Sequence, residues 1–225
     1  MNWKLPNQLT VGRIVLAGAF FVLLGLYDWA DDTSFWWLNA AFALYIVAGI
    51  TDVLDGWIAR KYHLTSAFGR IADPFVDKVL VVGAFAMLAG SNYAMPSPID
   101  IEGAATIVPR FEWDLPVWLT GRMSSAIQAW MVVVILAREF IVSAVRGYSE
   151  SRGVNFPATP AGKIKMFVQS VAICGVLFQL ANLRGVEWAV IAKVALVWLA
   201  VIVTVLSGAS YVGKARHLLT SDEPD

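Results

Sequence analysis

Long apolar stretches recur along the chain and constrain its fold more than any other feature. A helix needs about 20 mostly apolar residues to cross a bilayer. Six segments approach or reach that length, and the fourth continues as a helix past Arg138 and Glu139: residues 9–27, 33–51, 79–99, 123–137, 166–183 and 194–213. Of the 225 residues, 58% are hydrophobic and only 15% are charged, against about 25% charged in a soluble domain. Since backbone polar groups in lipid need internal partners, the sequence predicts an all-α integral membrane protein with six transmembrane helices.

Basic residues are distributed unevenly between the two sides of such a bundle. If the N-terminus is cytoplasmic, all but four of the 17 Lys and Arg residues lie on or near the cytoplasmic side. The exceptions are Arg110, Arg122, Arg184 and Lys193. Cytoplasmic loops carry such an excess, so we expect both termini in the cytoplasm and the chain in the cell (inner) membrane. The formal net charge of zero gives no indication of a nucleic-acid partner. We expect one domain, residues 1–219, and a disordered polar tail, residues 220–225.

Four acidic residues are concentrated where the second and third apolar segments meet the cytoplasmic side. Asp52 and Asp55 are three residues apart, and Asp73 and Asp77 are four apart, so each pair shares one face of a helix. The connection between the segments is short, so the two helices are predicted to be antiparallel neighbours whose carboxylates converge. The other residues on these faces are small and leave room for a ligand: Gly56, Ala59 and Gly69.

The predicted convergence has a chemical consequence. Four ionised carboxylates in a small volume repel one another unless cations neutralise them. Hard oxygen ligands suit Mg²⁺ or Mn²⁺, so all four are candidate metal ligands. Pro74 leaves the local structure open, because Asp73 could cap a helix that starts at Pro74, or the helix could start earlier and bend. Acids at membrane depth also mark ion pathways, so a cation transporter and a non-catalytic membrane protein are alternatives.

The spacing of these residues resembles the CDP-alcohol phosphatidyltransferase family. That family's pattern is D-x2-D-G-x2-A-R-x8-G-x3-D-x3-D, and the chain matches it at every fixed position from Asp52 to Asp77. The resemblance implies a catalytic six-helix membrane core, a homodimer and a site for divalent metal, with two ions, that faces the cytoplasm. It also implies that Asp77 is the general base. Four residues would line the site of the CDP group: Gly56, Ala59, Arg60 and Gly69.

Other segments resemble the bacterial phosphatidylglycerophosphate synthases of that family. These segments are residues 6–13, which include Arg13, and residues 138–165. Such enzymes transfer a phosphatidyl group from CDP-diacylglycerol to sn-glycerol 3-phosphate and release CMP. A family member with another acceptor, such as inositol phosphate, serine or a phospholipid, is an alternative.

The phosphate of a glycerol 3-phosphate acceptor would need cations. The candidates near the cytoplasmic ends of the fourth and fifth helices are Arg138, Arg146, Lys163 and Lys165, although basic residues are also expected there as topology anchors. Arg13, in the first helix, is a further basic residue on that side. Glu139 precedes Arg146 by seven residues, which places the two on one helix face, where they could pair.

Overall fold

Helices make up nearly all of the described chain. The computed structural model describes residues 5–29, 31, 33–62, 67–95, 114–152 and 160–220, and only the backbone of helical residues 5–9, 55–60, 62, 67–74 and 214–220. The long helices in these ranges are α1 (Leu5–Gly25), α2 (Phe35–Tyr62), α3 (Ala67–Leu88), α6 (Ala129–Ser151), α7 (Pro160–Asn182) and α8 (Glu187–Thr220). Two short elements, η1 (Ser91–Tyr93) and α5 (Val117–Thr120), lie between α3 and α6. The described residues contain no strand, which confirms the predicted all-α class.

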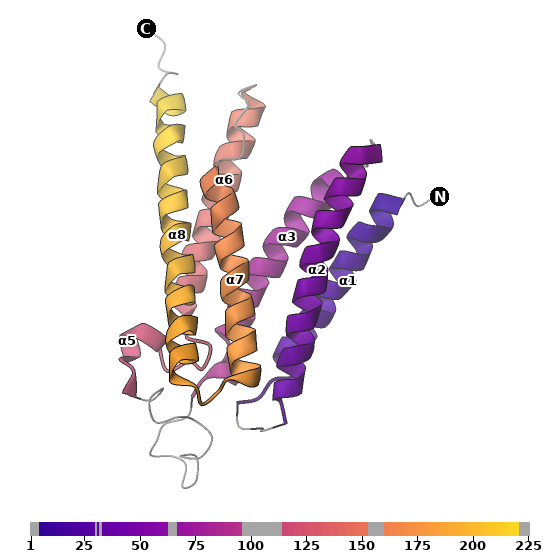
Figure 1. Cartoon of the computed structure of the whole chain (residues 1–225). Helices are drawn as coiled ribbons and strands as arrows, with labels where there is room; N and C mark the ends of the chain where they lie inside the picture. Colours follow the sequence, from indigo (N-terminus) through magenta and orange to yellow (C-terminus); the bar gives the residue numbers. More distant parts are fainter. Residues whose placement is uncertain are drawn as a thin grey trace.

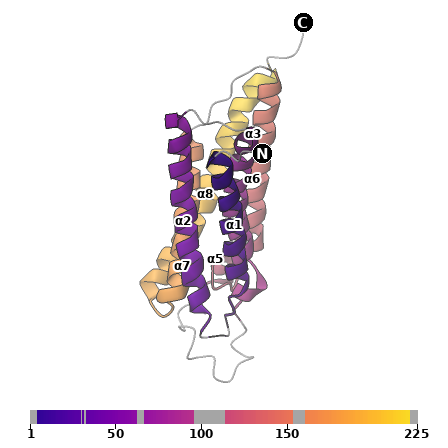
Figure 2. The same cartoon turned by 90° about the vertical axis from the view of Figure 1, so that its right-hand side faces the viewer.

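The helices run alternately up and down in one elongated bundle (Figure 1). α1, α2 and α3 pack together on one side, and α6, α7 and α8 lie on the other. α2 packs along α7 and joins the two halves. The start of α1 and the end of α8 lie at the same end of the bundle, as the perpendicular view in Figure 2 also shows. The end of α2 and the start of α3 are at that end too, so the parts of these helices that carry the acidic motif are neighbours.

The outer surface of the bundle is apolar. Large hydrophobic side chains point outward from most of the long helices, among them Val15, Val53, Phe75, Phe140, Phe167 and Leu206. In the described part of the chain, three segments are long and apolar enough to cross a membrane: Phe35–Leu54, Pro160–Asn182 and Glu187–Gly213. Thr10–Gly25 is a shorter apolar helix. A surface of this kind is unfavourable in water, and with the helix lengths it indicates a membrane protein.

The helix ends differ from the apolar stretches of the sequence, most of all in the third helix. α3 begins at Ala67 and ends at Leu88, so the predicted span of residues 79–99 lies too far along the chain. After Leu88 the chain turns through η1, and the backbone N–H of Met95 donates to the carbonyl oxygen of Arg122 (2.9 Å). An uncharged run does not distinguish a helix from a buried turn. The early start of α3 also decides the alternatives at Pro74, because Asp73 lies inside the helix and does not cap it.

Aromatic contacts close the end of the bundle opposite the start of α1 and the end of α8. Tyr93 is buried, stacks on Tyr27 with ring centroids 4.7 Å apart, and donates to the carbonyl oxygen of Leu24 (3.1 Å). Burial raises the pKa of Tyr93 above its usual range, so the phenol stays neutral and can donate this bond. Arg184 donates to the hydroxyl of Tyr27 (3.0 Å) and ties the α7–α8 turn to the same cluster.

Replacing Tyr93 should therefore weaken this end of the bundle in two steps. Tyr93→Phe loses one hydrogen bond and should cost about 1 kcal/mol. Tyr93→Ala also leaves a cavity and should cost roughly 3–5 kcal/mol. Thermal unfolding in detergent would measure both, with Trp36→Ala as the control because Trp36 is exposed on α2. Equal losses for Tyr93→Ala and Trp36→Ala would contradict this account.

Candidate functional site

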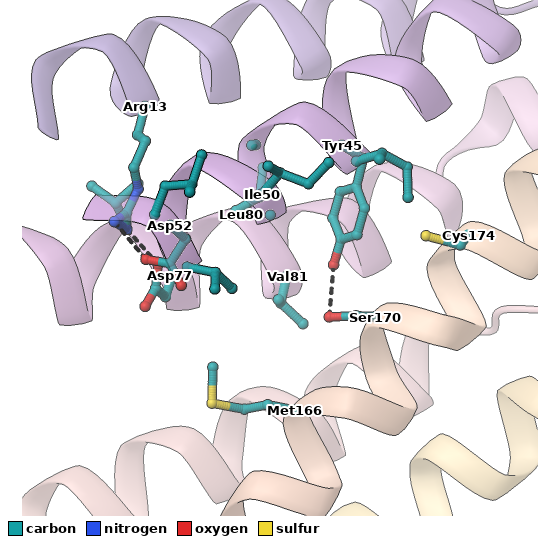
Figure 3. A pocket seen from close by; sticks show the side chains of 16 residues that line it. Arg13, Tyr45, Ile50, Asp52, Asp77, Leu80, Val81, Met166, Ser170 and Cys174 are labelled. Atoms are coloured by element: carbon teal, nitrogen blue, oxygen red, sulfur yellow. Dashed lines mark hydrogen bonds and ion pairs between the residues drawn. The ribbon is translucent and has the colours of Figure 1, made fainter. Parts of the chain in front are cut away.

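One guanidinium joins acidic residues from two different helices. Arg13 of α1 places Nη1 2.6 Å from Oδ1 of Asp52 and Nη2 2.6 Å from Oδ1 of Asp77 (Figure 3). The Arg13 side chain is only 4% exposed, whereas the side chains of Asp52 and Asp77 are 42% and 30% exposed. α1, α2 and α3 thus meet at one small charged centre, the first cluster, which consists of Arg13, Asp52 and Asp77. Sequence reasoning grouped Arg13 with the basic residues near the acceptor, but the structure places it among the acids.

The rest of the sequence motif follows the same two helices. Asp55 lies about one turn beyond Asp52 in α2, and Asp73 lies about one turn before Asp77 in α3. The structure therefore brings Asp52 and Asp77 together, the first and last acids of the motif. The side chains of the other motif residues lie outside the described part of the chain: Asp55, Gly56, Ala59, Arg60, Gly69 and Asp73.

Asp52 and Asp77 border a cavity of about 470 Å³ between α2, α3 and α7. Apolar side chains form most of its wall, among them Ile50, Leu80 and Met166. Figure 3 shows the charged centre at one end and Tyr45, Ser170 and Cys174 at the other. The Tyr45 hydroxyl donates to Oγ of Ser170 (3.2 Å). This cavity suits a molecule with a charged end and an apolar body.

Sequence reasoning missed the far end of the cavity. Tyr45 precedes Asp52 by seven residues, with Ala48 and Gly49 between them on the same helix face, so the spacing in α2 did contain a signal. Ser170 had no comparable signal, because its place depends on how α7 packs against α2. Cys174 is half-buried in the cavity wall.

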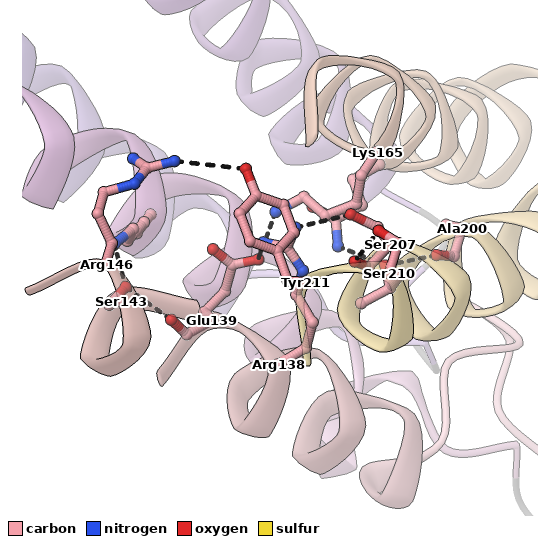
Figure 4. A network of polar contacts seen from close by, with 12 residues as sticks. Arg138, Glu139, Ser143, Arg146, Lys165, Ala200, Ser207, Ser210 and Tyr211 are labelled. Atoms are coloured by element: carbon pink, nitrogen blue, oxygen red, sulfur yellow. Dashed lines mark hydrogen bonds and ion pairs between the residues drawn. The ribbon is translucent and has the colours of Figure 1, made fainter. Parts of the chain in front are cut away.

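A second charged cluster lies between α6, α7 and α8 (Figure 4). Glu139 accepts hydrogen bonds from Nη1 of Arg138 (3.0 Å) and from the ammonium of Lys165. Arg138 also donates to Oγ of Ser207 (2.7 Å). All four side chains are buried. The predicted pairing of Glu139 with Arg146 is wrong, because Lys165 approaches Glu139 from a neighbouring helix and Arg146 instead donates to the hydroxyl of Tyr211 (3.4 Å).

A glycine makes room for this cluster. A Cβ added at Gly208 of α8 would lie 3.0 Å from Cγ of Arg138, closer than most real side chains approach one another. Gly208 therefore lets the arginine pass beside α8, and the ring of Tyr211 lies 5.5 Å from its guanidinium carbon. Close packing at this point explains how an arginine can be buried well inside the helix bundle.

The second cluster has more positive than negative charge. Arg138, Arg146 and Lys165 face one carboxylate, that of Glu139, and Nε of both arginines is buried without a hydrogen-bond partner among the described residues. Buried polar groups normally have partners, so these donors suit an anion. Lys163, the fourth predicted cation, is exposed on α7, and no contact of its side chain to the cluster is observed.

The two clusters are neighbours. Lys78, which follows Asp77 in α3, donates to Oγ of Ser143 in α6 (2.6 Å), one turn beyond Glu139. α7 separates the clusters, with Met166 in the cavity wall and Lys165 in the second cluster. An arrangement of this kind can hold one substrate in the cavity and a second, anionic one beside it.

The first cluster fits a divalent metal in its chemistry. Both Asp52 and Asp77 already share one positive centre, the guanidinium of Arg13, and carboxylate oxygens are the ligands that Mg²⁺ and Mn²⁺ prefer. Among the side chains that the structure describes, no group of three or more His, Cys, Asp or Glu could hold a metal ion. A full ligand set would therefore have to draw on Asp55 and Asp73.

One family model and several known proteins agree on the class of protein that this chain resembles. Residues 3–206 match the family model of CDP-alcohol phosphatidyltransferases. The chain is 33% identical over 218 residues to the CDP-diacylglycerol–glycerol-3-phosphate 3-phosphatidyltransferase of Bacillus subtilis, covering 94% of this chain and 95% of the relative. It is 33% identical to a probable phosphatidylglycerophosphate synthase of Mycobacterium tuberculosis, with 94% and 81% covered. It is 28% identical to a Rickettsia felis protein with the same name as the Bacillus one, with 92% and 93% covered.

The carboxylate of Glu139 should stabilise the fold by neutralising buried cations of the second cluster. Glu139→Gln would leave the buried cations Arg138 and Lys165 without their carboxylate, and breaking a buried pair costs roughly 3–5 kcal/mol. The apparent midpoint of thermal unfolding in detergent should therefore fall clearly. Glu150→Gln is the matched control, because Glu150 is an exposed residue of the same helix. A midpoint equal to that of the control would contradict a structural role for Glu139.

Proposed function

The chain belongs to the CDP-alcohol phosphatidyltransferase family, and we propose that it transfers the phosphatidyl group of CDP-diacylglycerol to sn-glycerol 3-phosphate, giving phosphatidylglycerophosphate and CMP. The relatives that carry this activity in their names are 28% to 33% identical over most of the chain. The observation that carries the proposal is the meeting of Asp52 and Asp77 at the border of an apolar cavity. A lipid with a charged pyrophosphate and apolar chains matches both parts of that cavity.

The charged end would hold the pyrophosphate. We propose that Asp52, Asp55, Asp73 and Asp77 bind two divalent cations, Mg²⁺ or Mn²⁺. When bound, these cations would neutralise the pyrophosphate oxygens and the departing CMP. The small residues Gly56, Ala59 and Gly69 would give the nucleotide access to α2 and α3, and Arg60 would pair with phosphate.

The chemical step would then need a base that removes a proton from the acceptor substrate. The hydroxyl of glycerol 3-phosphate attacks the lipid-side phosphorus, a new P–O bond forms, and the P–O bond to CMP breaks. Asp77 takes the hydroxyl proton as general base. Its place at the border of the cavity, 30% exposed in its side chain, leaves it accessible to a substrate.

The second cluster would bind the phosphate of the acceptor. Among the described residues the cluster carries more positive than negative charge, and the buried Nε groups of Arg138 and Arg146 have no hydrogen-bond partner there, which supports this role. Arg146 is the strongest candidate, because its hydrogen bond is to a neutral tyrosine, whereas Arg138 and Lys165 are both held by Glu139. Lys163 would act from the exposed edge. In this proposal Arg138 and Lys165 shape the site and Arg146 contacts the ligand.

The arrangement of the helices also supports a location and an orientation in the membrane. We propose that all six long helices cross the inner membrane, with both termini and the active site on the cytoplasmic side and residues 1–219 as one domain. The shared location of the start of α1 and the end of α8 supports this topology. The relatives' family also suggests a homodimer.

An acceptor assay tests the function directly. Purified enzyme in detergent would receive CDP-diacylglycerol, divalent metal and one acceptor at a time, with CMP release as the measurement. Glycerol 3-phosphate should be used in preference to inositol phosphate, serine or a phospholipid, and chelation of metal should stop the reaction. Preference for another acceptor would change the assigned substrate but not the family. Metal-independent CMP release would reject the metal mechanism.

Asp77→Asn should abolish turnover while largely sparing CDP-lipid binding. General-base catalysis is typically worth about 10²–10⁴-fold, so kcat should fall by at least that range if Asp77 also holds metal. Steady-state CMP release and a binding assay with CDP-diacylglycerol would measure the two effects. Asp114→Asn is the control, since Asp114 is exposed near the opposite end of the bundle. Near-normal turnover in Asp77→Asn would reject the assignment.

Arg146→Ala should act on the acceptor far more than on the lipid. Losing a charge-assisted hydrogen bond costs about 1.5–3 kcal/mol, which corresponds to roughly 10- to 150-fold in acceptor use. The KM for CDP-diacylglycerol should change little when each substrate is varied separately. Arg152→Ala is a matched control, because Arg152 lies at the exposed end of the same helix. Equal losses for both substrates would instead indicate a defect in folding.

A further inference from the structure

Arg13 holds a position that the proposed metal would also need. Its two Nη atoms each lie 2.6 Å from an Oδ1 atom, one of Asp52 and one of Asp77, and its side chain is almost fully buried. We infer that the Arg13 guanidinium is a counter-ion of Asp52 and Asp77, and that it competes with a divalent cation for these carboxylates. The inference rests on the proposed metal-dependent function, but it concerns a residue outside the acidic motif.

The contacts support exchange rather than a permanent link. A metal ligand must offer an ionised oxygen with a lone pair directed at the ion, and Mg²⁺ binds oxygen at about 2.0–2.1 Å. The Oδ1 atoms of Asp52 and Asp77 already accept short, charge-assisted hydrogen bonds from Arg13. A guanidinium and a divalent cation on the same oxygens would repel each other. The carboxylates are 42% and 30% exposed and line the cavity, so an incoming ion can reach them from the cavity.

A resident cation also answers a stability problem. Asp52 and Asp77 come from different helices, and without a positive charge they would push α2 and α3 apart. Arg13 neutralises part of this charge before any metal arrives and ties both helices to α1. The same attraction has to be overcome when metal binds. Arg13 therefore stabilises the metal-free bundle and weakens metal affinity at the same time.

The experiment measures Mn²⁺ binding to the purified full chain, without substrates, by electron paramagnetic resonance of free Mn²⁺. Arg13→Gln should bind Mn²⁺ at least about tenfold more tightly than wild type, because it loses two competing charge-assisted hydrogen bonds and one alone is worth about tenfold. The thermal midpoint of Arg13→Gln should be below that of wild type in EDTA, and saturating Mn²⁺ should reduce the difference. Arg184→Gln is the control, because Arg184 is another partly buried arginine at the opposite end of the bundle.

A second variant keeps the inference testable if Arg13→Gln does not fold. Arg13→Lys keeps the charge, but a lysine ammonium lacks the fork that holds two carboxylates at once, so its Mn²⁺ affinity should lie between those of wild type and Arg13→Gln. Unchanged or weaker Mn²⁺ binding in the folded variants would overturn the inference, because Arg13 would then be indifferent to the metal or would support it. No Mn²⁺ binding by wild type would instead overturn the metal assignment itself.

Discussion

Charges inside an apolar bundle have to find partners within the protein, and this constraint organises both clusters of the structure. An ionisable group at membrane depth is costly unless it is paired, and most of the described buried charges have a partner on another helix. Arg13 joins α1 to α2 and α3 through Asp52 and Asp77. Glu139 joins α6 to α7 through Lys165, and Arg138 joins α6 to α8 through Ser207. The polar residues of the proposed chemistry are therefore also contacts that fix how the helices pack.

Much of the fold could be predicted because hydropathy reports directly on helices in an apolar environment. The apolar stretches mark the centre of each long helix but not its ends. α2 continues past Asp52 to Tyr62, and α8 extends from Glu187 to Thr220, although both include charged residues beyond the apolar run. α3 shows the opposite error, since the described residues after Leu88, up to Met95, form turns and the short helix η1. Charged residues mark the limits of the lipid-facing part of a segment. The ends of the helix are instead set by hydrogen bonds and turns that hydropathy does not describe.

The site could be predicted only where its residues are close in sequence. The helical spacing of Asp52 with Asp55 and of Asp73 with Asp77 was readable, because i, i+3 and i, i+4 positions share a face. The partners of Asp77 and Glu139 were not readable. Arg13 is 64 residues from Asp77, and Lys165 is 26 residues from Glu139. Contacts at such separations depend on the rotation of each helix about its axis, which a single sequence does not specify.

α7 shows how one helix can serve two substrates. Met166, Ser170 and Cys174 repeat every four residues and line the cavity, while Lys165 and Gln169, also four apart, face the second cluster, where Gln169 donates to Oγ1 of Thr204 (2.9 Å). A lipid in the cavity and an anion at the second cluster would thus contact different faces of the same helix. Movement of α7 would change both sites together. The geometry of both proposed substrate sites is therefore tied to the packing of this helix against α2 and α8.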